Sequence, residues 1–160
     1  MAKQQTTVTG VLRDEHHWID GQFQTFKQGL AKGRVDGKPF QDAAKVLHRH
    51  IYLEEEVLFP EVEARGLMGP TMVMAQEHGQ ICSLLDEILD LIVGKASAGR
   101  VQDAMRKLEA ILSGHNFKEE NVLYPAADEM LSGEGDGVIS RLKEAKAPEG
   151  WTCRAHDQGD

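Results

Sequence analysis

The sequence lacks several features that mark other classes of protein. It has two cysteines and no C-x-x-C pair, so a disulfide scaffold and a thiolate metal site are both disfavoured, and we expect neither Cys82 nor Cys153 to form a structural bridge. No apolar run approaches the ~18 residues that a membrane span needs. The first ten residues, MAKQQTTVTG, lack the basic and then apolar segments of a signal peptide. We therefore expect a cytoplasmic protein without a membrane partner.

Positive charge is also in short supply. The 18 lysines and arginines face 26 aspartates and glutamates, which gives a net charge of −8. An acidic surface repels nucleic acid backbones and anionic lipids, so we expect no nucleic acid partner. A chain of 160 residues is about one domain long and can bury a core without disulfides.

The apolar residues that are present follow a helical period. No segment alternates with period two, and glycine-rich breakers at 32–39, 65–70 and 94–100 separate four long segments with apolar residues three or four positions apart. The predicted fold class is all-α, an up-down-up-down four-helix bundle within residues 1–146. Residues 138–145 are compatible with a short additional helix. Residues 147–160 read as an irregular tail, in which Trp151 is a candidate to fold back onto the bundle.

Two of the helical segments carry the same motif. HIYLEEEVLFP at 50–60 and HNFKEENVLYP at 115–125 both fit H-x-x-x-E-E-x-V-L-[F/Y]-P. The other two segments share E-H-x-x-I, at 15–19 and 77–81. The alternation of the two motifs indicates a duplicated helical hairpin, and a pseudo-two-fold bundle would bring both copies to one level of the core.

Polar residues stand where each apolar stripe should continue. These residues are His16, His50, Glu54, His78, His115 and Glu119. A single histidine on a core face is commonly structural, but a buried glutamate costs several kcal/mol unless it is paired with a cation or a metal. Arg49 and Lys118 are the basic residues near the glutamates in sequence, and helix geometry turns both away from the interior. Within each motif the histidine and glutamate are at i and i+4, so both project toward one point.

Four histidines and two carboxylates describe a dinuclear metal site. Without thiolates the site does not select soft ions, whereas imidazole and carboxylate together suit iron, manganese or zinc, and zinc is less favoured because it prefers four tetrahedral ligands. In the predicted arrangement one ion is bound by His16 and His50, the other by His78 and His115, and Glu54 and Glu119 bridge both. A solvent-derived oxo or hydroxo bridge would make five ligands, which leaves an octahedral ion one open position.

The two H-x-x-x-E-E motifs and the two E-H-x-x-I motifs, in this order, resemble the hemerythrin-like (HHE cation-binding) domains. The resemblance covers about residues 8–131. It implies a four-helix bundle around two non-haem iron ions, with the six residues named above at the family's ligand positions. Members of this family bind oxygen reversibly, sense oxygen or iron, or handle nitric oxide and peroxide.

The sequence departs from the oxygen-carrying hemerythrins at one point. Those proteins have a second histidine one turn from the first on the third helix, and a fourth-helix carboxylate at i+5. Here Met74 and Cys82 stand at the corresponding turn positions, and the carboxylate is at i+4. The resemblance then implies a more symmetric and more accessible metal pair. Redox chemistry with oxygen, peroxide or nitric oxide is favoured over simple oxygen storage or carriage, and an iron-responsive module read by a protein partner is the alternative from another class. Whether the protein turns over a substrate is left open.

The sequence also supports predictions for residues next to the candidate ligands. His17 is rotated about 100° from His16 on a helix, so we expect it to lie off the ligand face. Glu55 and Glu120 follow the ligand glutamates and are candidates to accept a hydrogen bond from the far nitrogen of a ligand histidine. Pro60 and Pro125 each remove one backbone hydrogen bond, so we expect a bend just past the site.

Overall fold

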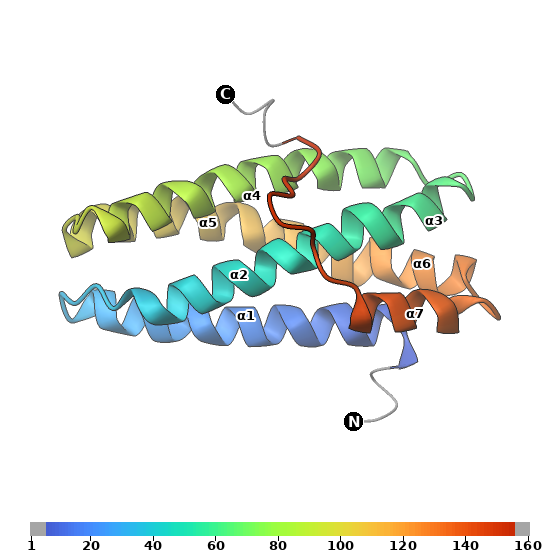
Figure 1. The fold of residues 1–160 in the computed structure, drawn as a ribbon, viewed down its shortest axis with the longest axis horizontal. Coiled ribbons are helices and arrows are strands. Elements are labelled where there is room, and N and C mark those ends of the chain that lie inside the picture. The colour runs from blue at the N-terminus through green and yellow to red at the C-terminus, as the bar shows by residue number, and fades with distance from the viewer. Residues whose placement is uncertain (1–5, 156–160) are drawn as a thin grey trace.

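The structure is a computed structural model of the chain and describes residues 6–155. Every regular element in that span is a helix, and four long helical arms lie side by side (Figure 1). The arms are α1 (Val8–Ala31), α2–η2–α3 (Gly37–Leu53, Glu54–Leu58, Phe59–Glu63), α4 (Gly69–Val93) and α5–η3–α6 (Ala98–Lys118, Glu119–Leu123, Tyr124–Met130). A shorter helix, α7 (Gly135–Glu144), packs against α1 and η2. Contacts of α1 with α2, α2 with α4, α4 with α5 and α5 with α1 close a ring, which is consistent with the predicted four-helix bundle.

Side-chain caps fix where three of the arms begin. Thr7, Asp36 and Ser97 stand just before α1, α2 and α5, and each side chain accepts a hydrogen bond from a backbone N–H of the first turn. The predicted breakers end the arms: Gly33 and Gly66 adopt φ of 76° and 101°, a conformation that L side chains rarely adopt. Within the described residues no helix is both long and apolar enough to cross a bilayer.

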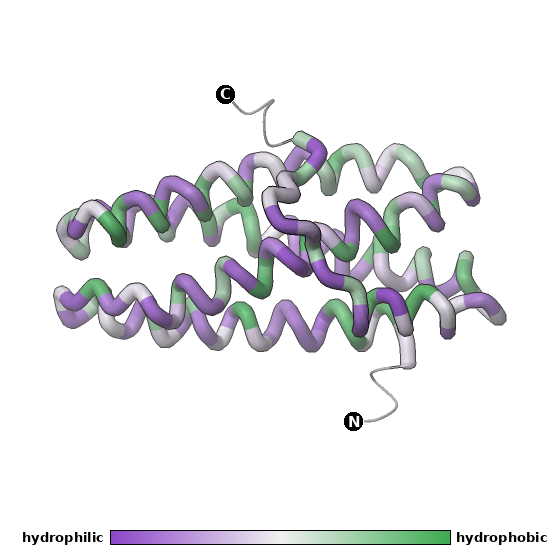
Figure 2. Tube along the Cα trace, viewed as in Figure 1, coloured by the Kyte–Doolittle hydropathy of each residue, from purple (hydrophilic) through white to green (hydrophobic). Residues whose placement is uncertain are grey.

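The apolar core is divided into two clusters. One gathers around Phe23, Phe26 and Phe40, and the other around Phe59 and Leu58 at the opposite end of the arms. Between them, on every arm, the chain places polar residues at buried positions, and hydrophilic and hydrophobic segments alternate along each arm in Figure 2. Each fully buried large apolar side chain contributes about 1.5–3 kcal/mol, so the clusters hold a polar level in place between them.

Both H-x-x-x-E-E motifs end in a π-helical segment. In η2 the Phe59 N–H bonds to the Glu54 carbonyl, and in η3 the Tyr124 N–H bonds to the Glu119 carbonyl, so each bond spans five residues instead of four. Proline follows one residue later in both arms. Because Pro60 and Pro125 have no N–H to donate, the wider turn forms where the helix is already short of one hydrogen bond.

The wider turn shifts the register of every residue after it, and the predicted buried stripe is wrong there. An uninterrupted α-helical period places Val122 inside, yet Val122 is 56% exposed and the next residue, Leu123, is buried. In the second arm the same period assigns Glu61 to the stripe, whereas the buried residue is Val62. One extra residue per turn explains both differences.

The segment after α7 crosses the outside of the bundle. Residues 145–155, which we call the C-terminal strap, run from the end of α7 over α2 toward α4 (Figure 1). Trp151 folds back as predicted, with its ring 5.3 Å from that of His48 and 5.2 Å from that of Tyr52. The rest of the predicted tail, residues 156–160, lies outside the described residues.

Candidate metal centre

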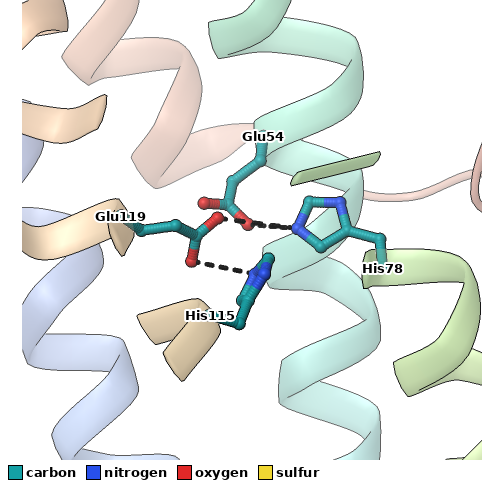
Figure 3. A group of neighbouring side chains, drawn as sticks. All are labelled: Glu54, His78, His115 and Glu119. Carbon is teal, nitrogen blue, oxygen red and sulfur yellow. Dashed lines mark ion pairs between the residues drawn. The ribbon is translucent and has the colours of Figure 1, made fainter. Parts of the chain in front are cut away.

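All six predicted residues meet at the polar level between the two apolar clusters. They are buried, and even the most exposed of them, His115, shows 3% of its surface. Figure 3 shows Glu54, His78, His115 and Glu119 converging from three different arms. The fold thus brings together the six side chains that the spacing of the motifs singled out.

The side chains form two groups that share one carboxylate. The first group is His16, His50 and Glu119, and the second is Glu54, His78, His115 and Glu119. Within each group one nitrogen or oxygen atom per residue lies within 4.8 Å of all the others. The histidines divide into the two predicted pairs, but of the two carboxylates predicted to be shared only Glu119 belongs to both groups, and Glu54 belongs to the second group alone.

Each histidine is oriented by a carboxylate on a neighbouring arm. The Nδ1 contacts are His16 with Glu120 at 2.9 Å, His50 with Glu15 at 2.8 Å, His78 with Glu55 at 2.7 Å and His115 with Glu77 at 2.9 Å. An Nδ1–H donated outward leaves the Nε2 lone pair facing the centre, which is the form that binds a metal ion. The predicted partners Glu55 and Glu120 are confirmed. Glu15 and Glu77 were not predicted to contact a histidine, although each is the glutamate of one E-H-x-x-I motif.

Basic residues neutralise two of the orienting carboxylates from outside. Arg49 lies 3.2 Å from Glu15, and Lys118 pairs with Glu77. The hydrogen bond from His115 lowers the pKa of Glu77, and Lys118 lowers it further. Arg49 and Lys118 thus point away from the interior as predicted, and they act on the layer of carboxylates around the centre.

Several buried atoms at the centre have no hydrogen-bond partner. They include Glu54 Oε1, Glu119 Oε2 and His78 Nε2. His78 Nε2 lies 3.2 Å from Glu54 Oε1, which is an ion pair when His78 is protonated (Figure 3), yet neither atom has a hydrogen bond. Buried acceptors left unpaired are costly, and a cation placed among them would satisfy all three. The donor set of imidazoles and carboxylates fits iron, manganese or zinc.

The two central carboxylates repel each other in the protein alone. Burial and the charge of Glu119 raise the pKa of Glu54. Burial opposes the charged form of Glu119 as well, but His115 and its other partners hold the pKa of Glu119 well below its usual range. Burial lowers the pKa of His16, but its hydrogen bond to Glu119 and that charge outweigh burial and raise the pKa to about 9. Protons therefore compete with metal ions for this site.

Tyr124 is the central residue that was not predicted. Its hydroxyl donates to Glu54 Oε2 at 2.6 Å and lies 3.1 Å from Glu119 Oε1. The same oxygen is 3.2 Å from His50 Nε2 and 3.3 Å from His16 Nε2. The register shift of η3 turns Tyr124 inward. The sequence feature that distinguished this position was the tyrosine of V-L-Y-P in the second repeat, where the first repeat has the phenylalanine of V-L-F-P.

The equivalent residue of the first repeat makes a different contact. Phe59 stacks on His78 with ring centroids 5.8 Å apart and planes 4° from parallel. The two halves of the centre thus differ: a phenol hydroxyl lies beside His16 and His50, and a phenyl ring covers His78. The pseudo-symmetry of the ligands does not extend to this residue.

Replacing His16 by alanine should sharply lower the metal content of the purified protein, whereas replacing His17 should leave it near wild type. His16 is 2% exposed and faces Glu119, while its neighbour His17 is exposed on the surface. Metal analysis of both variants, purified together with the wild type, measures the difference. Equal losses from both variants would contradict the assignment of the ligand face.

The comparisons with known proteins give the class. The model of the family described as "Hemerythrin HHE cation binding domain" matches residues 7–127, and the chain belongs to this family. A protein named DNA nickase from Nostoc sp. (strain PCC 7120 / SAG 25.82 / UTEX 2576) is 29% identical over 132 residues, which is 82% of this chain. The chain spans 36% of the length of that relative. No solved structure gives a significant match.

Proposed function

We propose that the protein holds two non-haem iron ions, joined by an oxo or hydroxo bridge, and reacts with oxygen, peroxide or nitric oxide. The observation that carries the proposal is the buried level of four Nε2 atoms and two carboxylates, in which three polar atoms have no hydrogen-bond partner. When bound, the ions supply electrons and positions that exchange small ligands. The net charge of −8 favours small-molecule partners over nucleic acid.

In this proposal each residue has a defined role. His16 and His50 hold one ion, His78 and His115 hold the other, and Glu54 and Glu119 bridge the pair. The two groups of neighbouring atoms support this division for the histidines and for Glu119, which both groups share. Glu54 lies in the group of His78 and His115, and its Oε1 atom is 3.5 Å from His50 Nε2 across the centre. Six protein ligands do not complete two octahedra, and Met74 lies in an apolar cluster instead of adding a seventh ligand.

Tyr124 gives the centre a proton and hydrogen-bond donor. Burial and the charges of Glu119 and Glu54 raise the pKa of Tyr124 well above its usual value, so the phenol keeps its proton near neutral pH. Its hydroxyl lies within 3.3 Å of both His16 and His50 Nε2 atoms. A small ligand at this half of the centre would have a protonated hydroxyl beside it as a hydrogen-bond donor, and one at the half covered by Phe59 would not.

The reduced, iron-loaded protein should oxidise when mixed with oxygen, without a long-lived oxygen complex, and should bind nitric oxide. Exchangeable positions beside a proton donor favour electron transfer followed by protonation. Stopped-flow absorption spectroscopy of the reduced protein measures both reactions. A stable and reversible oxygen complex would replace this proposal with oxygen storage or carriage. Spectra that respond to no small ligand would favour the iron-responsive module.

Tyr124→Phe should keep the iron and slow the reaction with peroxide by roughly tenfold or more, because a positioned proton donor typically contributes 10²–10⁴-fold. Phenylalanine fits the packing, since the first repeat carries Phe59 at the equivalent position. The matched control is Tyr52→Phe, which removes a hydroxyl from a residue that contacts Trp151 on the outer side of α2. A Tyr124→Phe protein that reacts with peroxide as fast as wild type would contradict the assigned role.

A further inference from the structure

The two cysteines of the chain meet outside the metal centre. Cys82 lies on α4, one turn beyond His78, and Cys153 lies on the C-terminal strap. They are 6% and 4% exposed and belong to the same cluster of buried residues, and Cys153 is the first cause of the raised pKa of Cys82. Cys153 Sγ also lies 3.7 Å from the backbone carbonyl of His78. Two thiols far apart in the sequence are thus held in contact beside the backbone of a proposed metal ligand.

A cavity of about 480 Å³ lies beside these thiols. Both cysteines line it, together with His48, Asp86 and Trp151. A volume in this range accommodates a small organic molecule. The cavity therefore provides space for a low-molecular-weight disulfide beside the two cysteines, outside the metal centre.

The strap is fastened on both sides of Cys153. Before it, the Trp151 carbonyl lies 3.0 Å from His48 Nε2. After it, the Arg154 N–H donates to Glu55 Oε1 at 2.7 Å, and the Arg154 guanidinium donates to the Glu55 carbonyl at 2.8 Å. The π pattern would pair that carbonyl with the nitrogen of Pro60, which has no hydrogen, so Arg154 supplies the missing donor.

The surface of α4 is shaped to receive the strap. A Cβ added at Gly79 would lie 2.6 Å from the Ala155 carbonyl oxygen, so only glycine allows this close approach. Gly79 directly follows His78 in α4. Arg154, which precedes Ala155 in the strap, has its guanidinium carbon 5.8 Å from the centre of the Phe59 ring. The fit keeps Cys153 in register with Cys82.

The strap also bears on one ligand of the centre. Glu55, which Arg154 holds, accepts from His78 Nδ1 at 2.7 Å. Glu55 is fully buried, whereas the equivalent carboxylate of the other repeat, Glu120, is 22% exposed. The strap therefore compensates the one orienting carboxylate that solvent does not reach, and it makes Arg154 a positioning residue for His78.

We propose that Cys82 and Cys153 form a redox-active dithiol that closes to an intramolecular disulfide and fastens the strap to α4 beside His78. With a low-molecular-weight disulfide as oxidant, one cysteine sulfur attacks it, forming a mixed disulfide and releasing one small thiol. The second cysteine then displaces the other small thiol. The dithiol loses two electrons and two protons, and the small disulfide becomes two thiols.

The proximity of Cys82 and Cys153 favours the closed disulfide at equilibrium. The raised pKa of Cys82 makes the formation of that disulfide slow. Two thiols held together have a high effective concentration for each other, which favours the intramolecular product over a mixed disulfide. The hydrogen bond to Cys153 and burial raise the pKa of Cys82, so little thiolate is present near neutral pH. Closure is therefore slow, and we expect it to take minutes to hours.

Intact-mass spectrometry tests the dithiol directly. The metal-loaded protein is equilibrated in mixtures of reduced and oxidised glutathione and then quenched with an alkylating reagent. We expect a product lighter by two hydrogen atoms and without alkylation, formed from the wild type and not from Cys82→Ser or Cys153→Ser. Glutathione adducts alone, or two alkylated thiols in fully oxidised glutathione, would overturn the proposal.

A second measurement tests the coupling to the centre and rests on the proposed metal binding. Metal loss to an excess of chelator is timed for the reduced and the disulfide form. Because outer contacts typically change metal affinity by 10–100-fold, we expect release about threefold or more slower from the disulfide form. Equal release from both forms would overturn the coupling, and a protein that binds no metal would contradict the proposed centre while leaving the mass result intact.

Discussion

Replacing Glu119 by glutamine is expected to remove nearly all bound metal from the protein. Glu119 is the one residue shared by both groups of candidate ligands, and it is fully buried. Glutamine keeps the volume of the side chain but loses the charge and one of the two oxygen acceptors that a bridge requires. Because both ions would lose a ligand at once, the effect should exceed that of changing any single histidine. Metal analysis of the purified variant measures it.

The matched control for this change lies on the same arm. Glu109→Gln alters a carboxylate of α5 that is 38% exposed and pairs with Lys27 on the surface. That variant should keep the metal content of the wild type. If Glu119→Gln retained a full complement of metal, the carboxylate would not bridge the ions and the proposed sharing would be wrong.

Removal of the metal is expected to lower the free energy of unfolding and the melting temperature substantially. The folded protein buries Glu54 and Glu119 against each other, and atoms of both lack hydrogen-bond partners. A ligand that binds only the folded state adds ~4 kcal/mol at a thousand-fold excess over its dissociation constant. For a chain of this size, that corresponds to a drop of roughly 10 °C in melting temperature after chelation. Thermal unfolding monitored by circular dichroism, with metal analysis of the same samples, measures the shift.

The Glu119→Gln variant separates this effect from a direct action of the chelator. Since that variant should bind almost no metal, the chelator should leave its melting temperature unchanged. An unchanged melting temperature in the wild type, with metal loss confirmed, would mean that the buried glutamates are compensated within the protein.

The ligand level was predictable because a regular α-helical period precedes it on every arm. His16, His50, His78 and His115 all lie where steps of three or four residues place them, and the two glutamates follow at i+4. Two separate copies of each motif made the pattern much less ambiguous than one copy would be. For residues that precede the π-helical segments, the buried face of each helix could be predicted from the helical period alone, without knowledge of the tertiary structure.

Residues beyond the ligands were harder to predict, for a local reason. A π turn adds one residue without altering the composition of the segment, so the apolar pattern alone does not reveal it. The shift exchanged Val122 for Leu123 at the buried face, and it brought Tyr124 to the centre. Pro60 and Pro125 were the available signal, and they indicated the disturbance in each helix but not its kind.

The layer around the ligands depends on contacts between arms. Glu15 reaches His50 and Glu77 reaches His115 across a helix interface, and no period along one helix encodes the relative rotation of two. The strap is the extreme case. Arg154 meets Glu55 at a separation of 99 residues, and the irregular sequence around Arg154 carries no helical or strand pattern from which the contact follows.

A low-temperature Mössbauer spectrum of the oxidised protein, loaded with ⁵⁷Fe, distinguishes a coupled pair of iron ions from isolated ions. Two ferric ions joined by a single-atom bridge and the carboxylates of Glu54 and Glu119 would be antiferromagnetically coupled. We expect a diamagnetic ground state for nearly all of the bound iron. A spectrum with the magnetic splitting of isolated high-spin ferric ions would show that the site does not hold a coupled iron pair, and the proposed di-iron centre would be wrong.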